Sequence, residues 1–346
     1  MHMSLRIPAT FTAHGAMCCR LFRYHREIVK DEELMTTRPV SARSLFTVHA
    51  TGIVLVAAAA LLWSTVGVTA RGITAVAATN ALVIGFLRLA VAGPTLVAAH
   101  IASSRRSPFH IARRDWPAVL LLGAAMAAYQ VTEFAALPRL GITRTILLAI
   151  CTAPVFIALF AAIALHERFP RRAVLPMLLA LCGTALLVGS GNTEAGGLPP
   201  VGIALALAAA AMYALVATAS RALAPRYPAA QTVAVAFTIG AVLLAPFALT
   251  SGPQAFALGT RGWVLIAMLG LVPTAFAYLL FLRGLRTVPA TTAGILSLLE
   301  PLGATFLAAA LFGERLPLPA LVGAVILLLG LALFVMASGV RERIKS

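Results

Sequence analysis

Residues 144–190 read RTILLAICTAPVFIALFAAIALHERFPRRAVLPMLLALCGTALLVGS, and residues 292–335 read TAGILSLLEPLGATFLAAALFGERLPLPALVGAVILLLGLALFV. Each stretch consists of a long apolar run with a proline, a Glu-Arg pair, a short turn and a second apolar run with glycine. Coinciding proline, acidic and glycine positions do not follow from composition alone, so they indicate an internal repeat. A shift of 147 positions superposes Phe134 on Phe281, Arg139 on Arg286, Pro154 on Pro301, Glu167 on Glu314, Pro170 on Pro317 and Gly183 on Gly330.

The whole chain is as apolar as these two stretches. Of its 346 residues, 61% are hydrophobic and only 11% are charged, and the mean hydropathy is +0.96. A water-soluble domain of this size carries about a quarter of charged residues, so the composition excludes most soluble enzymes. A hydrocarbon core about 30 Å thick requires roughly 20 apolar residues per helical span. We predict ten such spans, at residues 51–70, 80–100, 117–137, 143–165, 173–190, 200–222, 230–250, 262–282, 290–312 and 318–338.

The spans and the repeat together predict the architecture. Alanine, leucine and valine fill the spans without period-two alternation, which favours helices over the strands of an outer-membrane barrel. A shift of 150 positions pairs Trp63 with Tyr213 and Arg71 with Arg221, so each half holds five spans. Because five is an odd number, the second half enters the membrane from the opposite side. We predict an all-α membrane protein of ten transmembrane helices, arranged as two inverted five-helix repeats.

Three regions follow from this architecture. Residues 1–49 carry seven basic residues and no continuous apolar run, so we expect a disordered basic cytoplasmic extension and not a signal peptide. Residues 50–190 form the first repeat, with spans one to five. Residues 200–340 form the second repeat, with spans six to ten. The short connecting loops leave no room for a catalytic domain outside the membrane.

The basic residues are distributed unequally between the two sides of the membrane. The chain has 27 Lys and Arg residues against 11 acids, a formal charge of +16. On the predicted spans, 21 of the 27 lie on the side of both termini, five lie on the opposite side, and Arg88 lies within a span. The positive-inside rule then places both termini in the cytoplasm. The net positive charge therefore reflects the orientation of the helices in the membrane, and we expect no nucleic-acid partner.

The two quoted stretches resemble the second part of an EamA repeat in the drug/metabolite transporter superfamily. That pattern is a proline-containing helix, a terminal Glu-Arg pair, a short turn and a glycine-bearing last helix. Trp63-Ser64 in the first span and Arg88 in FLRLAVAG match further family positions. The second half departs from the pattern, because it has no arginine at the position of Arg88 and has Tyr213 in place of tryptophan.

The resemblance implies a bundle in which helices 1–4 and 6–9 surround a central cavity, with helices 5 and 10 at the periphery. Members of the family export or exchange amino acids and other small metabolites. Inverted repeats that meet near the midplane of the membrane build one site that opens to either side. The high Arg-to-Lys ratio and the many alanines are typical of a GC-rich bacterial genome, so we expect a bacterial plasma (inner) membrane.

Polar side chains within the spans mark a candidate substrate site. An arginine in hydrocarbon costs roughly 2.5–3.5 kcal/mol, so Arg88 should face protein, water or an acid. It binds either a substrate carboxylate through its guanidinium fork, or a carbonyl or acid of a neighbouring helix. Glu133 shares a helix face with Tyr129 and Gln130. This carboxyl either binds a substrate ammonium or a coupled proton, or forms a structural ion pair with Arg88.

The ninth span carries a second acid within the membrane. Glu300 precedes Pro301, where the helix leaves a carbonyl unpaired, and it has the same two interpretations, a site role or a structural one. Pro154 and Pro301 are expected to bend the fourth and ninth spans around the cavity. Trp63 and Tyr213 either line the cavity or pack against a neighbour, and the repeat relation favours lining.

Two Glu-Arg pairs, Glu167-Arg168 and Glu314-Arg315, end the fourth and ninth spans beside water. We expect them to act as helix caps or as ties between helices that hold a gate, and not as substrate contacts.

Missing motifs narrow the mechanism further. The sequence has no GxxxxGK loop for ATP, its seven histidines never form HExxH, and its four cysteines make no CxxC. We therefore expect no metal, no cofactor and no enzymatic activity. Transport is then driven by a gradient, by an exchange partner or by downhill flow.

The sequence predicts a secondary-active transporter that exports small metabolites such as amino acids across the plasma membrane by alternating access. Drug efflux or nucleotide-sugar transport is the alternative, and an intramembrane lipid-handling protein is a third reading. The expected partners are a small-molecule substrate and the lipid bilayer, and the sequence leaves room for a homodimer. The predicted substrate-binding residues are Trp63, Arg88, Tyr129, Gln130, Glu133, Tyr213 and Glu300.

Overall fold

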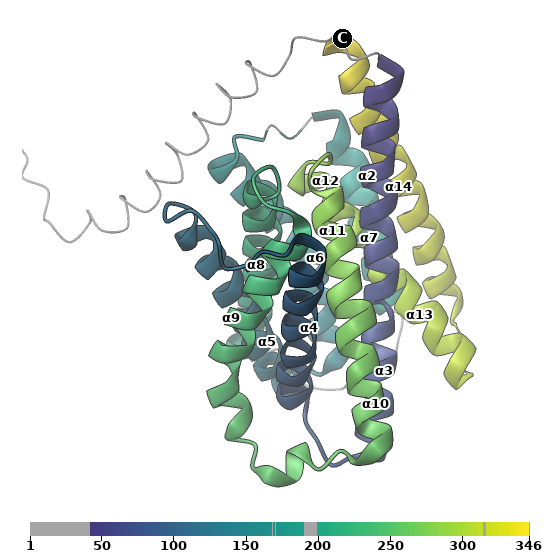
Figure 1. Ribbon diagram of the computed structural model, residues 1–346. Helices are drawn as coiled ribbons and strands as arrows, with labels where there is room; N and C mark the ends of the chain where they lie inside the picture. Colours follow the sequence, from purple (N-terminus) through teal and green to yellow (C-terminus); the bar gives the residue numbers. More distant parts are fainter. Residues whose placement is uncertain (1–41, 168, 170, 190–198, 314–315, 346) are drawn as a thin grey trace, which may run out of the picture.

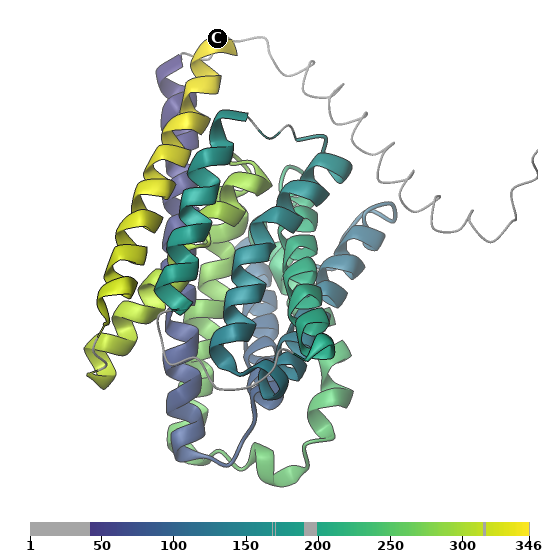
Figure 2. The ribbon, with the colours of Figure 1, turned by 180° about the vertical axis from the view of Figure 1, so that it is seen from behind.

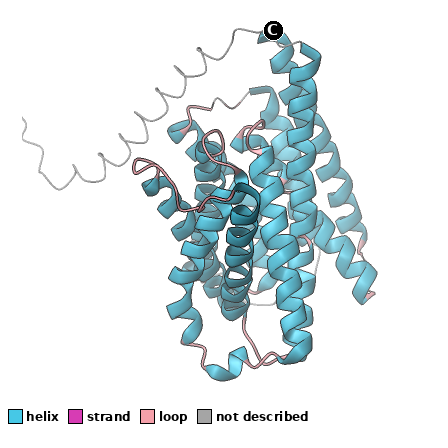
Figure 3. Cartoon of the chain, viewed as in Figure 1, coloured by secondary structure: helices cyan, strands magenta, loops and turns pink. Residues whose placement is uncertain are grey.

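The computed structural model describes residues 42–167, 169, 171–189, 199–313 and 316–345. In these residues every regular element is a helix, and no strand occurs (Figure 3). The helices stand side by side as a bundle (Figure 1). Ten segments are long and apolar enough to cross a membrane: His49–Val76, Ala81–Ser104, Trp116–Leu140, Arg144–Ala164, Arg171–Gly189, Pro200–Leu223, Ala229–Leu249, Gly259–Gly284, Ala290–Leu311 and Leu318–Ala337.

These ten segments coincide with the ten predicted spans, so the predicted fold class is confirmed. The first helix begins at Ala42 and so includes residues 42–49 of the predicted extension. Residues 1–41 lie outside the described chain. In chain order the helices are α2 (Ala42–Trp63), α3 (Thr65–Val76), α4 (Ala81–Ser104), α5 (Trp116–Leu140), α6 (Ile142–Ala164), η2 (Arg171–Ala173), α7 (Val174–Gly189), α8 (Pro200–Leu223), α9 (Ala229–Leu249), η3 (Pro253–Phe256), α10 (Gly259–Leu269), η4 (Gly270–Phe276), α11 (Ala277–Gly284), α12 (Ala290–Leu296), α13 (Leu299–Phe312) and α14 (Leu318–Lys345).

Both described ends of the chain lie at one end of the bundle. The start of α2 and the end of α14 are at the top of Figure 1, and we call this end the terminal face. Five spans separate the start of α2 from the start of α8, so the second half begins at the opposite face. The two halves therefore run through the bundle in opposite directions.

Three of the spans depart from a regular α-helix near their middle. The first is divided between α2 and α3 at Ser64, whose hydroxyl donates to the Leu61 carbonyl at 2.6 Å. The ninth is divided between α12 and α13 at residues 297–298. In the eighth, η4 is a π-helical turn that contains Pro273, and the Thr274 hydroxyl donates to the Leu269 carbonyl five residues earlier. Such bends and π-turns re-aim the side chains that follow them.

The last helices of the two repeats, α7 and α14, pack along each other at the side of the bundle (Figure 2). Glycines allow this close approach. A Cβ added at Gly330 would lie 2.5 Å from the Ala180 nitrogen, and one at Gly323 would lie 2.5 Å from the Leu187 nitrogen. A Cβ added at Gly183 would overlap the backbone of Leu327 in the same way. Backbone cannot yield as a side chain does, so these positions require glycine.

A buried acid joins the two halves at the terminal face. Asp115, at the start of α5, has a side chain only 1% exposed and forms an ion pair of 3.0 Å with Arg226 in the α8–α9 loop. The Tyr227 hydroxyl donates to the same carboxylate at 2.5 Å. Burial and this hydrogen bond raise the pKa of Tyr227, so the phenol keeps the proton that it donates. The α4–α5 loop is thereby fixed to the α8–α9 loop.

We expect Gly183→Ala to lower the midpoint of thermal unfolding in detergent, because the added methyl forces α7 and α14 apart. Overpacking of this kind costs about 1–3 kcal/mol. The matched control is Gly67→Ala on α3, where an added Cβ meets no atom within 4 Å, so its midpoint should be unchanged or slightly raised. Equal midpoints for both variants would contradict the close approach of α7 and α14.

Candidate functional site

Aromatic rings from α2, α5, α8 and α11 meet around Trp63, the last residue of α2. Trp63 lies edge-on to Tyr213 of α8, with ring centroids 6.3 Å apart. It also contacts Tyr278 at 4.9 Å and Phe281 at 5.1 Å, both on α11. Tyr129 of α5 lies 6.1 Å from Tyr213. The rings of Trp63, Tyr129 and Tyr213, predicted as site residues, therefore form one continuous group.

The charged residues of the spans lie beside these rings. Tyr129 lies one turn before Glu133 on α5, and the two side chains act on each other electrostatically. Arg88 of α4 is near enough to act electrostatically on Glu133 and on Glu300 of α13, and the two carboxyls act on each other. We call this group the central cluster; its members are Trp63, Arg88, Tyr129, Glu133, Tyr213, Tyr278, Ser297 and Glu300.

The predicted structural ion pair between Arg88 and Glu133 does not form in the described chain. Among the described residues, no guanidinium nitrogen of Arg88 lies within 4.0 Å of a carboxylate oxygen of Glu133 or Glu300. One cation and two carboxyl groups thus share a small region without being locked together. This leaves their charged atoms available to a bound molecule.

The irregular parts of three spans set the positions of the cluster. The Tyr213 hydroxyl bonds the Ser297 hydroxyl at 3.0 Å, at the break between α12 and α13. Glu300 follows this break and is one turn from Gly303, which packs against Ser64 closely enough that a Cβ would lie 2.7 Å from its hydroxyl. Residues three apart share a helix face. This face of α13 therefore lies against the break in the first span, next to Trp63.

The π-turn of the eighth span packs against the backbone of α4 at Arg88. A Cβ added at Gly270, the first residue of η4, would lie 3.2 Å from the carbonyl oxygen of Arg88 and 2.7 Å from Val91. Only a glycine allows η4 to lie this close to α4. The turn also precedes Tyr278 directly, so one irregular segment places the backbone of Arg88 and the ring of Tyr278.

Three buried donors in this region have no hydrogen-bond partner among the described residues. They are the indole Nε1 of Trp63, the guanidinium Nε of Arg88 and the amide Nε2 of Gln130. Buried donors are nearly always paired, so unpaired ones within one region call for an acceptor supplied from outside the chain. Gln130 follows Tyr129 on α5 and lies against α4, with its Oε1 2.9 Å from a Cβ built on Gly85, one turn before Arg88.

The two prolines occupy different positions in their helices. Pro154 lies within α6, which is continuous from Ile142 to Ala164. Pro301 lies in the first turn of α13, where a helix needs no backbone donor. That they bend these spans stays a prediction.

Sequence reasoning did not identify Tyr278 or Phe281. In the shift of 147 positions, Tyr278 corresponds to Val131 and Phe281 to Phe134. Neither Val131 nor Phe134 is a predicted site residue, so the repeat gave no reason to select their counterparts. Their contact with Trp63 depends on the π-turn, for which hydropathy gives no signal. Ser297, one turn before Glu300, is likewise not among the predicted site residues.

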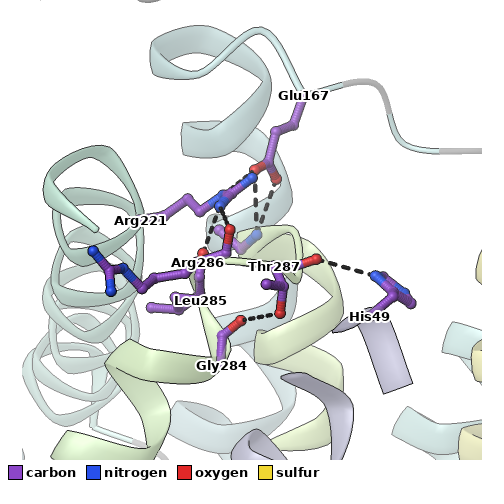
Figure 4. Close-up of polar contacts among 8 residues, drawn as sticks. His49, Glu167, Arg221, Gly284, Leu285, Arg286 and Thr287 are labelled. Carbon is purple, nitrogen blue, oxygen red and sulfur yellow. Dashed lines mark hydrogen bonds and ion pairs between the residues drawn. The ribbon is translucent and has the colours of Figure 1, made fainter. Parts of the chain in front are cut away.

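A second polar group lies at the terminal face (Figure 4). The Glu167 carboxylate accepts from the Ala290 backbone N–H at 3.1 Å and from the Arg221 Nε at 3.4 Å. The guanidinium of Arg221 also donates to the carbonyls of Leu285 at 2.5 Å and Arg286 at 3.1 Å. Glu167 thus caps α12 and ties it to α8, which confirms the predicted cap or tie. Arg168, Glu314 and Arg315 lie outside the described residues.

Known proteins resemble the chain over both halves. The model of the EamA-like transporter family matches residues 50–189 and again residues 200–336. The uncharacterized transporter YwfM of Bacillus subtilis (strain 168) is 33% identical over 273 residues, which is 79% of this chain and 90% of that protein. The uncharacterized inner membrane transporter YicL of Salmonella typhimurium is 25% identical and covers 84% of this chain and 97% of its own.

A solved crystal structure has the same fold. It superposes with a TM-score of 0.72 over 82% of this chain and 98% of its own, at 23% sequence identity. The two matched copies of the family model contain five described spans each. The chain therefore belongs to the EamA-like transporter family, and it is a multi-pass membrane transporter of the drug/metabolite transporter superfamily.

Proposed function

We propose that the chain exports amino acids or closely similar small zwitterions across the plasma membrane, with the central cluster as its substrate site. The observation that carries this proposal is the position of Arg88, within electrostatic reach of both Glu133 and Glu300 but not paired with either. A zwitterion presents a carboxylate and an ammonium a few ångströms apart. It therefore matches a guanidinium and two carboxyls that act on one another electrostatically.

The unpaired donors support the same substrate class. A carboxylate has lone pairs for several donors, and Trp63, Arg88 and Gln130 each offer a buried N–H without a partner in the described chain. Glu133 and Glu300 would hold the ammonium. The rings of Tyr129 and Tyr213 would contact the rest of the molecule. One guanidinium, two carboxylates and a neutral zwitterion leave one negative charge, which a proton or a cation on one of the carboxyls would balance.

Drug efflux is the second candidate, because two acids among aromatic rings also suit a cationic amphiphile. A nucleotide sugar fits less well, since its phosphates would meet one arginine and two carboxyls. Export is the direction that the family resemblance implies. The strong bias of basic residues supports cytoplasmic termini, and the name of the Salmonella relative supports an inner-membrane location.

Counterflow of labelled amino acids and cationic drugs into proteoliposomes, at two pH values, tests the substrate. We expect amino acids to exchange, and Arg88→Gln to weaken their apparent affinity about 10- to 100-fold, the effect of losing a charged hydrogen bond. The matched control is Arg283→Gln, since this arginine is exposed on α11. Exchange of drugs alone, or equal affinities for both variants, would contradict the assignment.

Replacing the indole of Trp63 separates a substrate role from packing. Trp63→Phe keeps a ring against Tyr278 and removes a donor that has no partner among the described residues. We expect unfolding stability to change by less than about 1 kcal/mol, while the affinity for amino acids falls several-fold. Trp116→Phe, at the start of α5 and away from the cluster, should leave the affinity unchanged. A loss of stability with unchanged affinity would assign the indole to packing.

A further inference from the structure

Two polar groups join the repeats at the terminal face, and they differ in burial. The Asp115 group consists of Asp115, Arg226 and Tyr227, with the exposed Arg114 4.0 Å from the carboxylate; the side chain of Asp115 is 1% exposed and that of Arg226 is 15% exposed. The Glu167 group consists of Glu167, Arg221, Leu285, Arg286 and Ala290. In the ion pair of this second group the side chains are 16% and 27% exposed. Water therefore reaches the Glu167 group but not the Asp115 carboxylate.

This difference decides which group can open. Separating a buried ion pair leaves an uncompensated charge in an apolar interior, which is strongly unfavourable. In a partly hydrated ion pair, each charged side chain can replace the other with water at little cost in free energy, because solvent already screens the charges. The Asp115 group is therefore suited to a permanent junction, and the Glu167 group to a reversible one.

The Glu167 group also gathers helix ends that are far apart in the chain. Glu167 follows α6, Arg221 ends α8, and Ala290 begins α12. The Arg286 Nε donates to the carbonyl of Ala224, the residue after α8, at 2.9 Å. His49 of α2 bonds the Thr287 carbonyl of the same linker at 3.0 Å. Release of this group would free the ends of α6 and α8 and the start of α12 together (Figure 4).

We propose that the Glu167 group is the releasable latch of the terminal face and the Asp115 group its fixed pivot. This rests on the proposed alternating-access function, since a transporter must open each face in turn. Breaking the ties of Glu167 lets α6 separate from α8 and α12 while the α4–α5 and α8–α9 loops stay joined. Glu167 and Arg221 are thus positioning residues that set which face is open.

The repeat supplies a matched control at the other end of the bundle. Arg71 is the repeat counterpart of Arg221 in the shift of 150 positions, and it is exposed at the opposite face. Changing Arg71 removes the same charge from an equivalent helix position without touching the latch.

Cysteine labelling from the side of the terminal face tests the latch without any substrate. The four native cysteines, Cys18, Cys19, Cys151 and Cys182, are replaced by serine, and Ala217→Cys is introduced. Ala217 is 0% exposed and lies one turn deeper than Arg221 on the same face of α8. A membrane-impermeant maleimide should therefore reach it only when the latch opens.

We expect Glu167→Gln and Arg221→Gln each to increase the labelling rate about tenfold, as the loss of a charge-assisted hydrogen bond predicts. Arg71→Gln should not increase it. Asp115→Asn should instead lower the midpoint of thermal unfolding, which Glu167→Gln should leave within a few degrees. These midpoints, measured on the same detergent samples, separate opening from loss of fold.

Parent-like labelling of both latch variants would overturn the proposal, as would an equal increase in Arg71→Gln. Faster labelling of Asp115→Asn with an unchanged unfolding midpoint would assign the latch to Asp115 instead. Because labelling needs no substrate, a failure of amino-acid counterflow would count against the proposed substrate and leave the latch result standing.

Discussion

Hydrocarbon offers no hydrogen-bond partner, and this constraint orders every polar atom of the bundle. The backbone meets it by forming helices across the membrane. Many threonines meet it within their own helix, each donating its hydroxyl to the carbonyl four residues earlier. These are Thr95, Thr132, Thr152, Thr184, Thr218, Thr238 and Thr305. Arg88, Glu133 and Glu300 are not satisfied in this way, and they act on one another electrostatically.

The scaffold could be predicted from the sequence because its signals are local. Twenty apolar residues in a row determine a span wherever they occur, and proline, glutamate and glycine at equal spacing revealed the repeat. Glu167 could be predicted as a tie because its place at the end of a span limits what a carboxylate can contact. The repeat relation indicated Trp63 and Tyr213 as candidates for lining the cavity, and the cost of a charge in hydrocarbon indicated Arg88.

The contacts within the central cluster could not be predicted, because they depend on backbone irregularities. One π-turn at residues 270–276 rotates the rest of the eighth span and brings Tyr278 and Phe281 onto Trp63. The break at 297–298 likewise determines that Tyr213 meets Ser297. Hydropathy is nearly the same for either register of such a span, so it contains no information about which side chains face inward.

The repeats share their scaffold but not the charged residues of the central cluster. In the shift of 147 positions, Glu133 corresponds to Leu280 and Glu300 to Ala153. The second half has no arginine to match Arg88. The symmetry therefore governs how the helices are arranged, whereas the charged side chains make one asymmetric centre.

The seam between α7 and α14 has a consequence for motion. Gly183 and Gly330 come from equivalent positions of the two repeats, and each sits directly on the backbone of the other helix. Two helices interlocked at backbone level resist sliding along their length, since every step would drive Cα atoms over one another. The seam therefore holds the last helices of the two repeats in one fixed register. Relative movement of the repeats has to take place among the remaining helices of the bundle.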